Sequence, residues 1–275
     1  MDDFTCDILV LGAGPGGISA ALTARARGRR VTVISNPPGT SSLARAHKID
    51  NYPGLGGMSG AALLAAMEKD LREQDIPLIT ARVTAAMPMG GRFMVSAGQD
   101  VYSAGALILA TGAAQPKPYP GEAELLGRGV SYCATCDGML YRGKAVAVIG
   151  LSDEAPAEAE FLRGIGCKVE YFDKSRAKSY EIRGEGQVTA LVADGTEYPA
   201  DGVFILRDTV AASLLLPGLH MDSGHIATDG EMKTNIPGVF AAGDCTGRPY
   251  QIAKAVGEGN IAALSADAYI KGELT

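Results

Sequence analysis

The sequence predicts an α/β fold made of two units with the same layout. In the first unit, an apolar run over residues 7–11 ends in a glycine-rich turn, an Ala-rich helical stretch follows to about Arg27, and a second apolar run covers 31–34. The order of strand, turn, helix and strand recurs from residue 145. This order is typical of Rossmann-like, three-layer domains built on a doubly wound parallel sheet. We expect two such dinucleotide-binding domains, of which the second is shortened.

The remaining elements of the first unit follow from periodicity and turn residues. Residues 61–74 are predicted to be a helix, with Ser59 as its cap. Two or three short strands are expected next, separated by glycine turns, and 106–110 is predicted to be a buried strand. Near the end of the chain we expect a strand at 239–242 and a helix at 251–266.

The second unit is preceded by a stretch rich in proline and glycine. Pro116, Pro118, Pro120 and Gly121 predict a linker. We then expect a strand at 145–149, a helix near 156–164 and a strand at 168–172.

Length and charge narrow the class of protein. A chain of 275 residues is long enough for two domains. The net charge of −6 argues against a nucleic-acid partner. The acidic N-terminus precedes an apolar run of only strand length, so neither a signal peptide nor a membrane span is expected. Five cysteines in such a chain favour a reducing, cytoplasmic location.

The first glycine turn predicts a dinucleotide site. Gly12-Ala13-Gly14-Pro15-Gly16-Gly17 lies between a strand and a helix, which is the context that gives the pattern its meaning. Gly12 permits the tight turn, Gly14 allows the backbone to approach a pyrophosphate, and Gly17 allows close helix–strand packing. The following helix N-terminus attracts phosphate. The acidic residue that usually holds a ribose is replaced by Ser35 and Asn36.

Cys133-Ala134-Thr135-Cys136 places two thiols close enough to form a small, reducible disulfide. Zinc is the alternative for any such pair, but it requires four ligands. Cys6, Cys167 and Cys245 are scattered singly, with only three histidines in the chain, so we expect no metal site. The three single cysteines are predicted to be buried small apolar residues.

Two further segments resemble known flavin-binding motifs. Ala110-Thr111-Gly112 and the stretch 238–244 resemble FAD contacts of the pyridine nucleotide–disulfide oxidoreductase superfamily. The resemblance implies that Asp244 bonds the flavin ribityl chain and that Gln251 and Ile252 lie near the isoalloxazine ring. The FAD-binding residues expected on this basis, with those of the first turn, are Gly12, Ala13, Gly14, Pro15, Gly17, Ser35, Asn36, Asn51, Val83, Ala110, Thr111, Gly112, Gly243, Asp244, Gln251 and Ile252.

Around the cysteine pair the resemblance becomes specific. The stretches 129–138 and 141–144, with Asn51-Tyr52-Pro53-Gly54 and 256–259, are similar to bacterial low-molecular-weight thioredoxin reductases. The resemblance covers about 7–149 and 230–266. It implies that Cys136 faces the flavin, that Cys133 attacks the partner disulfide, and that Asp137 is the acid–base residue. A plain turn residue before Gly138 is the alternative for Asp137.

The same resemblance implies a domain plan. The FAD-binding domain comprises residues 1–113 and 221–275 and is split by a central domain of 114–220 that carries the redox disulfide. The family also implies a homodimer, with thioredoxin as the disulfide substrate.

The second unit departs from the family at its nucleotide site. Its turn runs from Gly150 to Ala155, with Ser152 where a glycine would let the pyrophosphate approach, and with two acidic residues at the helix start. The stretch from Asp173 to Gln187 is too short for the usual helix and strand, and the late glycine and Pro-Asn are replaced around 206–209. Asp173 stands where NAD enzymes place a ribose-binding acid, so NAD stays an alternative. Lys174, Arg176 and Lys178 form either an attraction site for an acidic protein or a solvated face.

These observations predict an FAD-dependent thioredoxin-disulfide reductase whose electron donor is not NADPH. The chain is similar to ferredoxin-dependent flavin thioredoxin reductases, so ferredoxin or another acidic protein is the expected donor. The alternatives are an NAD(P)H-dependent thioredoxin reductase, an oxidoreductase for small-molecule dithiols and disulfides, and a non-catalytic redox-sensing flavoprotein.

Overall fold

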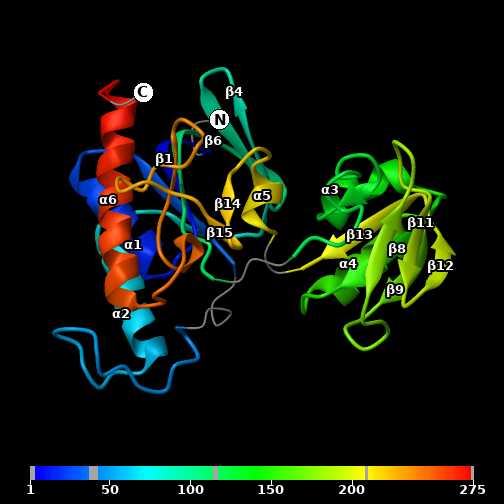
Figure 1. The fold of residues 1–275 in the computed structure, drawn as a ribbon, viewed down its shortest axis with the longest axis horizontal. Helices are drawn as coiled ribbons and strands as arrows, with labels where there is room; N and C mark the ends of the chain where they lie inside the picture. The colour runs from blue at the N-terminus through cyan, green and yellow to red at the C-terminus, as the bar shows by residue number, and fades with distance from the viewer. Residues whose placement is uncertain (1–3, 37–42, 114–116, 208–209, 274–275) are drawn as a thin grey trace. The chain divides into compact units, whose positions relative to one another are not determined.

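The computed structural model describes residues 4–36, 43–113, 117–207 and 210–273. The chain divides into two compact units, Met1–Gln115 with Ala212–Thr275, and Pro116–Ala211 (Figure 1). The return to the larger unit lies at Ala212, whereas the sequence analysis placed it after His220. The reason is that Ala212, Leu216 and Leu219 pack in the core of the larger unit. Pro116 of the predicted linker and residues 208–209 lie outside the described residues.

The larger unit is built on a mixed sheet in the order β3-β2-β1-β6-β5-β4, with β16 paired to β6. Strands β1, β2, β3 and β16 run parallel to their neighbours, and β4, β5 and β6 form an antiparallel meander. The first half of β6 pairs with β5, and its last three residues pair with β16. The strands are β1 (Thr5–Leu11), β2 (Val31–Ser35), β3 (Leu78–Thr80), β4 (Val83–Met89), β5 (Arg92–Ala97), β6 (Asp100–Leu109) and β16 (Val239–Ala241).

Three long helices belong to the larger unit: α1 (Pro15–Ala26), α2 (Gly60–Glu73) and α6 (Ile252–Ile270). α1 and α6 lie side by side (Figure 1) and approach closely, since a Cβ built on Gly259 would lie 2.1 Å from the carbonyl oxygen of Gly16. Ser59 caps α2 by accepting a hydrogen bond from the N–H of Ala62 at 3.2 Å, as the sequence predicted. Short elements complete this unit: α5 (Ala212–Leu215), β14 (Met221–Asp222), β15 (His225–Ile226) and the 3-10 helix η2 (Asp244–Thr246).

The smaller unit contains a parallel sheet in the order β7-β13-β8-β9. After β9 the chain forms a separate antiparallel sheet in the order β10-β11-β12, instead of the helix and strand of a full doubly wound domain. The unit comprises β7 (Val130–Ser131), α3 (Ala134–Asp137), the 3-10 helix η1 (Gly138–Tyr141), β8 (Ala145–Gly150), α4 (Ala155–Gly164), β9 (Lys168–Phe172), β10 (Tyr180–Arg183), β11 (Ala190–Ala193), β12 (Thr196–Pro199) and β13 (Gly202–Leu206).

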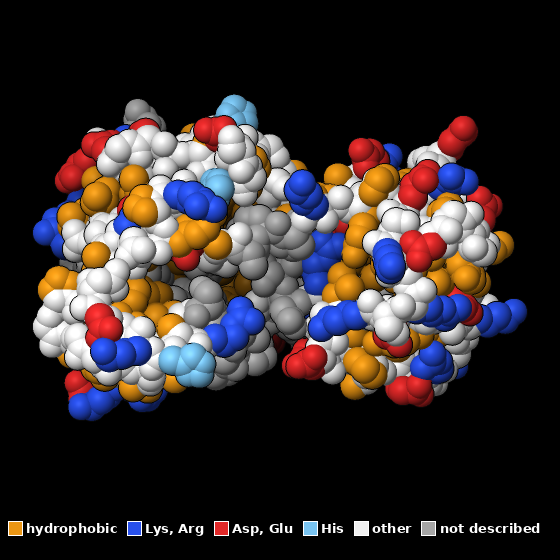
Figure 2. All heavy atoms as spheres, turned by 60° about the horizontal axis from the view of Figure 1, so that its bottom comes forward, with side chains coloured by type: hydrophobic (Ala, Val, Ile, Leu, Met, Phe, Trp, Pro, Cys, Tyr) orange, Lys and Arg blue, Asp and Glu red, His pale blue; other side chains and the backbone are white. Residues whose placement is uncertain are grey.

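The fold is therefore α/β, with a Rossmann-like mixed sheet and a second parallel sheet. The predicted strands at 7–11, 31–34, 145–149, 168–172 and 239–242 are confirmed within one or two residues at their ends. Among the described residues, none of the helices combines the length and the apolar character needed to cross a bilayer. Charged side chains of both signs are interspersed on the visible face of each unit (Figure 2).

A buried carboxylate ties α1 to α6. Asp267 on α6 is 3% exposed and accepts hydrogen bonds from Arg27 Nε at 3.1 Å, Arg29 Nε at 2.6 Å and Lys271 Nζ at 2.9 Å. Burial raises the pKa of this carboxyl, but the three cationic partners outweigh burial and lower the pKa to about 2. The charged form is therefore held in the folded state.

We expect Asp267→Asn to lower the free energy of unfolding by about 2 kcal/mol near neutral pH, because charge-assisted hydrogen bonds are lost. The folded-state pKa is depressed, so the stabilisation is complete above about pH 4 and is lost as the pH falls towards 2. Urea unfolding of wild type and variant between pH 2.5 and 7 measures both effects.

Asp50→Asn is the matched control, since its ion pair with Lys48 is 65% exposed on both sides and contributes little. Equal stability of the Asp267 and Asp50 variants at neutral pH would contradict the role of Asp267.

Candidate active site

A pocket of about 510 Å³ lies in the larger unit, at the carboxyl ends of its parallel strands. The β1–α1 turn, the end of β6, the Gly243-Asp244 turn and the start of α6 contribute to it. Nine predicted cofactor-binding residues line this pocket: Gly14, Pro15, Asn51, Ala110, Gly112, Gly243, Asp244, Gln251 and Ile252.

The other predicted cofactor residues do not line this pocket. They are neighbours of lining residues in the sequence, or they lie at the ends of strands. Gly12, Ala13 and Gly17 belong to the first turn and helix, and Thr111 stands between two lining residues. Ser35 ends β2 with Asn36 directly after it, and Val83 begins β4. Two further lining residues, Gly16 and Ala242, belong to the predicted motifs. Lining residues that sequence reasoning missed are Leu43, Ala46, Lys48, Ile49, Ala113, Tyr250 and Ala255. Most belong to loops without a pattern of their own, so only the tertiary structure identifies them.

The first turn has the geometry that its glycines predict. Gly12 has φ +115°, and a Cβ built on it would lie 2.2 Å from the carbonyl oxygen of Ala110. A Cβ on Gly17 would lie 1.9 Å from the carbonyl oxygen of Gly12. At Gly14, by contrast, no atom of the described residues comes within 4 Å of an added Cβ. The backbone at Gly14 is therefore open to a ligand, at the end of a helix whose first N–H groups lack intrahelical acceptors.

A hydrogen-bond network from α6 holds the turn that carries Asp244. Glu258 Oε2 accepts from the N–H of Gly243 and from Thr246 Oγ1, both at 2.8 Å. Lys254 Nζ donates to the carbonyl oxygens of Gly243 at 2.9 Å and Gly247 at 2.8 Å. The pKa of Asp244 is raised above its ordinary value, chiefly by burial; Lys254 opposes this increase, and Glu258 adds to it. Lys254 and Glu258 thus position Asp244 at the pocket without themselves lining it.

These residues fit a dinucleotide in the pocket. The open backbone at Gly14 and the N-terminus of α1 suit a pyrophosphate, and the Asp244 carboxylate suits a ligand hydroxyl. Asn51 Nδ2 donates to Gln251 Oε1 at 2.7 Å, which ties the 43–51 loop to the first residues of α6.

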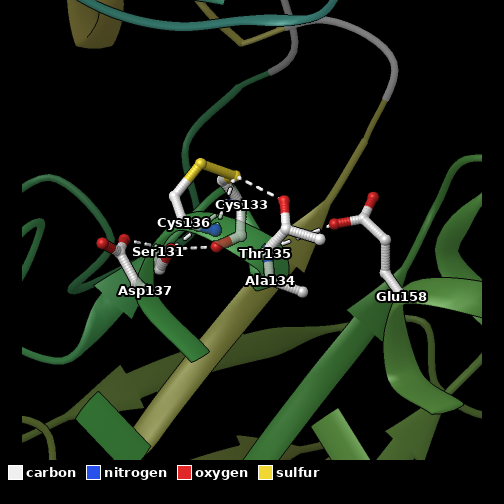
Figure 3. The surroundings of a disulfide bond; sticks show 7 residues. All are labelled: Ser131, Cys133, Ala134, Thr135, Cys136, Asp137 and Glu158. Atoms are coloured by element: carbon white, nitrogen blue, oxygen red, sulfur yellow. Dashed lines mark hydrogen bonds between the residues drawn. A yellow bond between two sulfur atoms is a disulfide. The ribbon is translucent and has the colours of Figure 1, made fainter. Parts of the chain in front are cut away.

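The predicted disulfide between Cys133 and Cys136 is present in the smaller unit, with the two Cα atoms 5.3 Å apart (Figure 3). Cys133 is the extended residue that caps α3, and its Sγ accepts from the N–H of Cys136 at 3.2 Å. Cys133 is 6% exposed, whereas Cys136 is exposed at the surface. The two sulfurs are thus not equivalent: only that of Cys136 belongs to an exposed residue.

Asp137 is linked to the redox pair through Ser131, a residue that sequence reasoning missed. Ser131 Oγ donates to Asp137 Oδ2 at 2.6 Å and accepts from the N–H of Cys133 at 3.1 Å (Figure 3). On the other side, Glu158 from α4 accepts from the N–H of Ala134 at 3.2 Å. Asp137 therefore lies in a hydrogen-bonded chain that ends at the backbone of Cys133.

Exposed apolar side chains follow the disulfide directly. Met139 and Leu140 in η1 are 57% and 69% exposed, and Phe161 on the neighbouring helix α4 is 37% exposed. Phe161 and the adjoining Leu162 contact Gly138, so this helix packs against the start of η1. Large exposed apolar groups beside a reactive group are typical of a protein interaction site.

The second glycine turn is closed in a way that the first is not. The N–H groups of Leu151 and Ser152 both donate to the carbonyl oxygen of Leu206, at 2.7 and 3.0 Å. Tyr171 lies against Gly150, since its hydroxyl would be 2.2 Å from a Cβ there. Asp173 follows β9, and its Oδ1 accepts from Ser175 and from the N–H of Arg176. Backbone and carboxylate groups that would serve a nucleotide therefore have partners within the protein.

Comparison with known proteins now places the chain. The family model of the pyridine nucleotide-disulphide oxidoreductases matches residues 6–177 and 174–259. A thioredoxin reductase of Listeria innocua is 33% identical over 300 aligned positions, covering 96% of this chain and 94% of the relative. The chain belongs to the low-molecular-weight thioredoxin reductase family. It is a flavoprotein-type oxidoreductase of that family, with its redox disulfide in place.

Two solved structures show the range of similar reductases. A ferredoxin-flavin thioredoxin reductase from Clostridium acetobutylicum superposes with a TM-score of 0.82 at 38% identity, covering 98% of this chain and 99% of that one. An atypical thioredoxin reductase from Desulfovibrio vulgaris Hildenborough gives a TM-score of 0.67 at 31% identity, covering 97% and 98%.

The five cysteines differ in exposure, and this difference predicts the order in which they are alkylated after mild reduction. Burial raises the pKa of Cys6 and of Cys245 to about 11 and also raises that of Cys167, and all three are buried, which confirms the expectation for the single cysteines. We expect Cys136 to react with iodoacetamide at least about tenfold faster than Cys133, and the other three only after unfolding. Peptide mass spectrometry over a time course measures these rates. Faster labelling of Cys133 would show that the arrangement of the pair changes on reduction.

Proposed function

We propose that this reductase transfers electrons from a protein donor such as ferredoxin, through FAD and the Cys133–Cys136 disulfide, to the disulfide of thioredoxin. The observation that carries the proposal is the contrast between the two glycine turns. The first turn is open at Gly14. In the second turn, the N–H groups of Leu151 and Ser152 donate to the carbonyl oxygen of Leu206.

The residues that line the pocket of the larger unit suit FAD. The start of α1 and Gly14 would hold the pyrophosphate, Asp244 would accept from the ribityl chain, and Gln251 and Ile252 would lie near the flavin ring. The flavin would supply the two-electron chemistry that reduces the disulfide. The residues of the chain itself bind and orient it, and the Lys254–Glu258 network keeps Asp244 in place.

The packing of the smaller unit supports a donor other than NADPH. Ser152 is buried where a glycine would admit the pyrophosphate, and the N–H groups of Leu151 and Ser152 donate to Leu206. Of the three basic residues after β9, Arg176 stacks on Phe172, with its guanidinium 4.3 Å from the ring centroid, and pairs with Glu170. That guanidinium therefore serves the local fold. The similar structure from Clostridium, which is described as a ferredoxin-flavin enzyme, supports a protein donor.

The cysteine pair would reduce thioredoxin by two exchanges. In the reduced reductase, the thiolate of Cys133 attacks one sulfur of the thioredoxin disulfide, whose S–S bond breaks as a mixed disulfide forms. Cys136 then attacks the sulfur of Cys133, which re-forms the Cys133–Cys136 bond and releases dithiol thioredoxin. The reductase dithiol is oxidised, the thioredoxin disulfide is reduced, and two protons pass to thioredoxin. Asp137, held by Ser131, would deliver a proton to the leaving thiolate.

The surface beside the pair supports a protein substrate rather than a small disulfide. Met139 and Leu140 present apolar side chains directly after Cys136 and Asp137. A protein partner buries such groups, whereas a small disulfide leaves them in water. By resemblance to the family we also propose a cytoplasmic location and a homodimer. Light scattering on the purified protein tests whether it is a dimer.

The donor is tested by anaerobic titration of the purified protein while the flavin absorbance is followed. We expect reduced ferredoxin to bleach the band and NADPH or NADH to leave it unchanged over minutes, because the N–H groups of Leu151 and Ser152 in the second turn already donate to Leu206. Dithionite serves as the positive control for a reducible flavin. Stoichiometric bleaching by NADPH within seconds would show that the chain is a nicotinamide-dependent reductase.

The roles of the two cysteines are tested with single variants. We expect Cys136→Ser to trap a stable mixed disulfide between Cys133 and thioredoxin, and Cys133→Ser to lose turnover without trapping, since the attacking thiol is absent. Non-reducing gels and intact mass measure the adduct. Because Cys136 is the exposed cysteine, trapping only in the Cys133 variant would reverse the assignment. A variant of buried Cys167, Cys167→Ala, is the matched control.

A further inference from the structure

A carboxylate is fully buried near the point where the chain enters the smaller unit. Glu122 is 0% exposed, and its side chain has three described donors. Oε2 accepts from the N–H of Tyr119 at 2.8 Å and from Arg207 Nη2 at 3.0 Å, and Oε1 accepts from the hydroxyl of Tyr132 at 2.9 Å. A buried charge is tolerated only when it is paired in this way.

The cationic partner comes from the point where the chain leaves the same unit. Arg207 directly follows β13, is 5% exposed, and lies with its guanidinium 5.1 Å from the ring centroid of Tyr119. The smaller unit extends from Pro116 to Ala211, so Glu122 belongs to its first residues and Arg207 to its last. The ion pair therefore joins the incoming and outgoing segments at the base of the unit.

The third partner leads to the redox pair. Tyr132 precedes Cys133 and follows β7, which pairs with β13 at Val130 and Ser131. Its ring is buried, and burial together with the charge and hydrogen bond of Glu122 raises its pKa, so the hydroxyl stays a donor. The backbone of Cys133 is held on the other side by Ser131. A single side-chain hydrogen bond thus joins Glu122 to Tyr132, the residue directly before Cys133.

We propose that Glu122, Arg207 and Tyr132 form a clasp that joins the first and last segments of the smaller unit to the segment carrying Cys133, and that this clasp positions the disulfide for electron transfer and exchange. Residues in the clasp act through the position of Cys133, since the described hydrogen bonds of Glu122 are to Tyr119, Tyr132 and Arg207. The proposal rests on the function proposed above, in which the disulfide must meet both an internal reductant and thioredoxin.

Tyr132→Phe is the sharpest test, since it keeps the buried ring and removes only the hydrogen bond to Glu122. We expect kcat for thioredoxin reduction to fall about tenfold, because small displacements of reacting groups are costly. KM for thioredoxin is expected to stay within twofold, since Met139 and Leu140 are untouched. The melting temperature and the rate at which dithiothreitol reduces the disulfide in the apoprotein should also stay close to wild type.

Tyr180→Phe is the matched control. Tyr180 is a buried tyrosine of the same unit whose hydroxyl has no hydrogen-bond partner among the described residues, and its ring also contacts Tyr119. We expect wild-type kcat for this variant. Equal losses in the Tyr132 and Tyr180 variants, or a kcat within twofold of wild type for Tyr132→Phe, would overturn the clasp as a positioning device.

Arg207→Met tests the connection between the two chain segments. We expect faster proteolysis near residues 117–121 and 207–212 than in Arg183→Met, a control that removes an exposed arginine paired with Glu181 and Glu197. If Arg207→Met folds, adding Tyr132→Phe should lower kcat little further, because both changes act through Glu122. Additive losses would overturn the shared role, and failure of Arg207→Met to fold leaves Tyr132→Phe as the deciding measurement.

The two proposals fail in different ways. Wild-type protein that reduces no thioredoxin with any electron donor, photochemically reduced flavin included, refutes the proposed function itself. Wild-type turnover with an unaffected Tyr132 variant refutes only the clasp.

Discussion

The chemistry of each unit depends on where the backbone N–H groups of its first strand–helix turn are directed. In the larger unit, the turn is open at Gly14, and the N-terminus of α1 lies at a pocket large enough for part of a dinucleotide. In the smaller unit, the equivalent N–H groups of Leu151 and Ser152 donate to Leu206. A phosphate must compete with an existing hydrogen bond there, and a buried donor gives up its partner only at a cost of about 1–3 kcal/mol.

This one difference distinguishes two units of the same layout: the first turn is open at Gly14, and the second is closed by its hydrogen bonds to Leu206. The end of β13, next to the closed turn, carries Arg207, which pairs with buried Glu122 instead of serving a ligand. Doubly wound folds bind ligands at the carboxyl ends of their parallel strands. At the end of β13 in this unit, Arg207 instead binds a side chain of the protein itself. The smaller unit retains the parallel strands that hold β7 and the disulfide, and replaces the outer helix and strand by a small antiparallel sheet.

The redox pair shows how secondary structure makes two cysteines different. A Cys-x-x-Cys pair at the start of a helix places one cysteine at the cap and the other in the first turn. The cap position buries Cys133 and lets its sulfur accept the N–H of Cys136, while the first-turn position leaves Cys136 exposed. Ser131 adds a hydrogen bond to Asp137, so the acid–base candidate is linked to the backbone of Cys133. The function proposed for the chain assigns the two sulfurs different partners.

The sequence by itself determined the elements whose signals are local. Glycine spacing located both turns, the alternation of apolar runs located the main strands, Ser59 located a helix start, and Cys-x-x-Cys located the disulfide. These signals are carried by neighbouring residues, because steric demands at a turn or a cap act over a few positions. Only the tertiary structure brought Glu122 to Arg207, which lie 85 positions apart, and placed Ser131 against Asp137. The tertiary structure also supplied the acceptor that closes the second turn, since Leu206 belongs to a distant strand. Contacts of this kind depend on strand order and burial, which leave no periodic pattern in the chain.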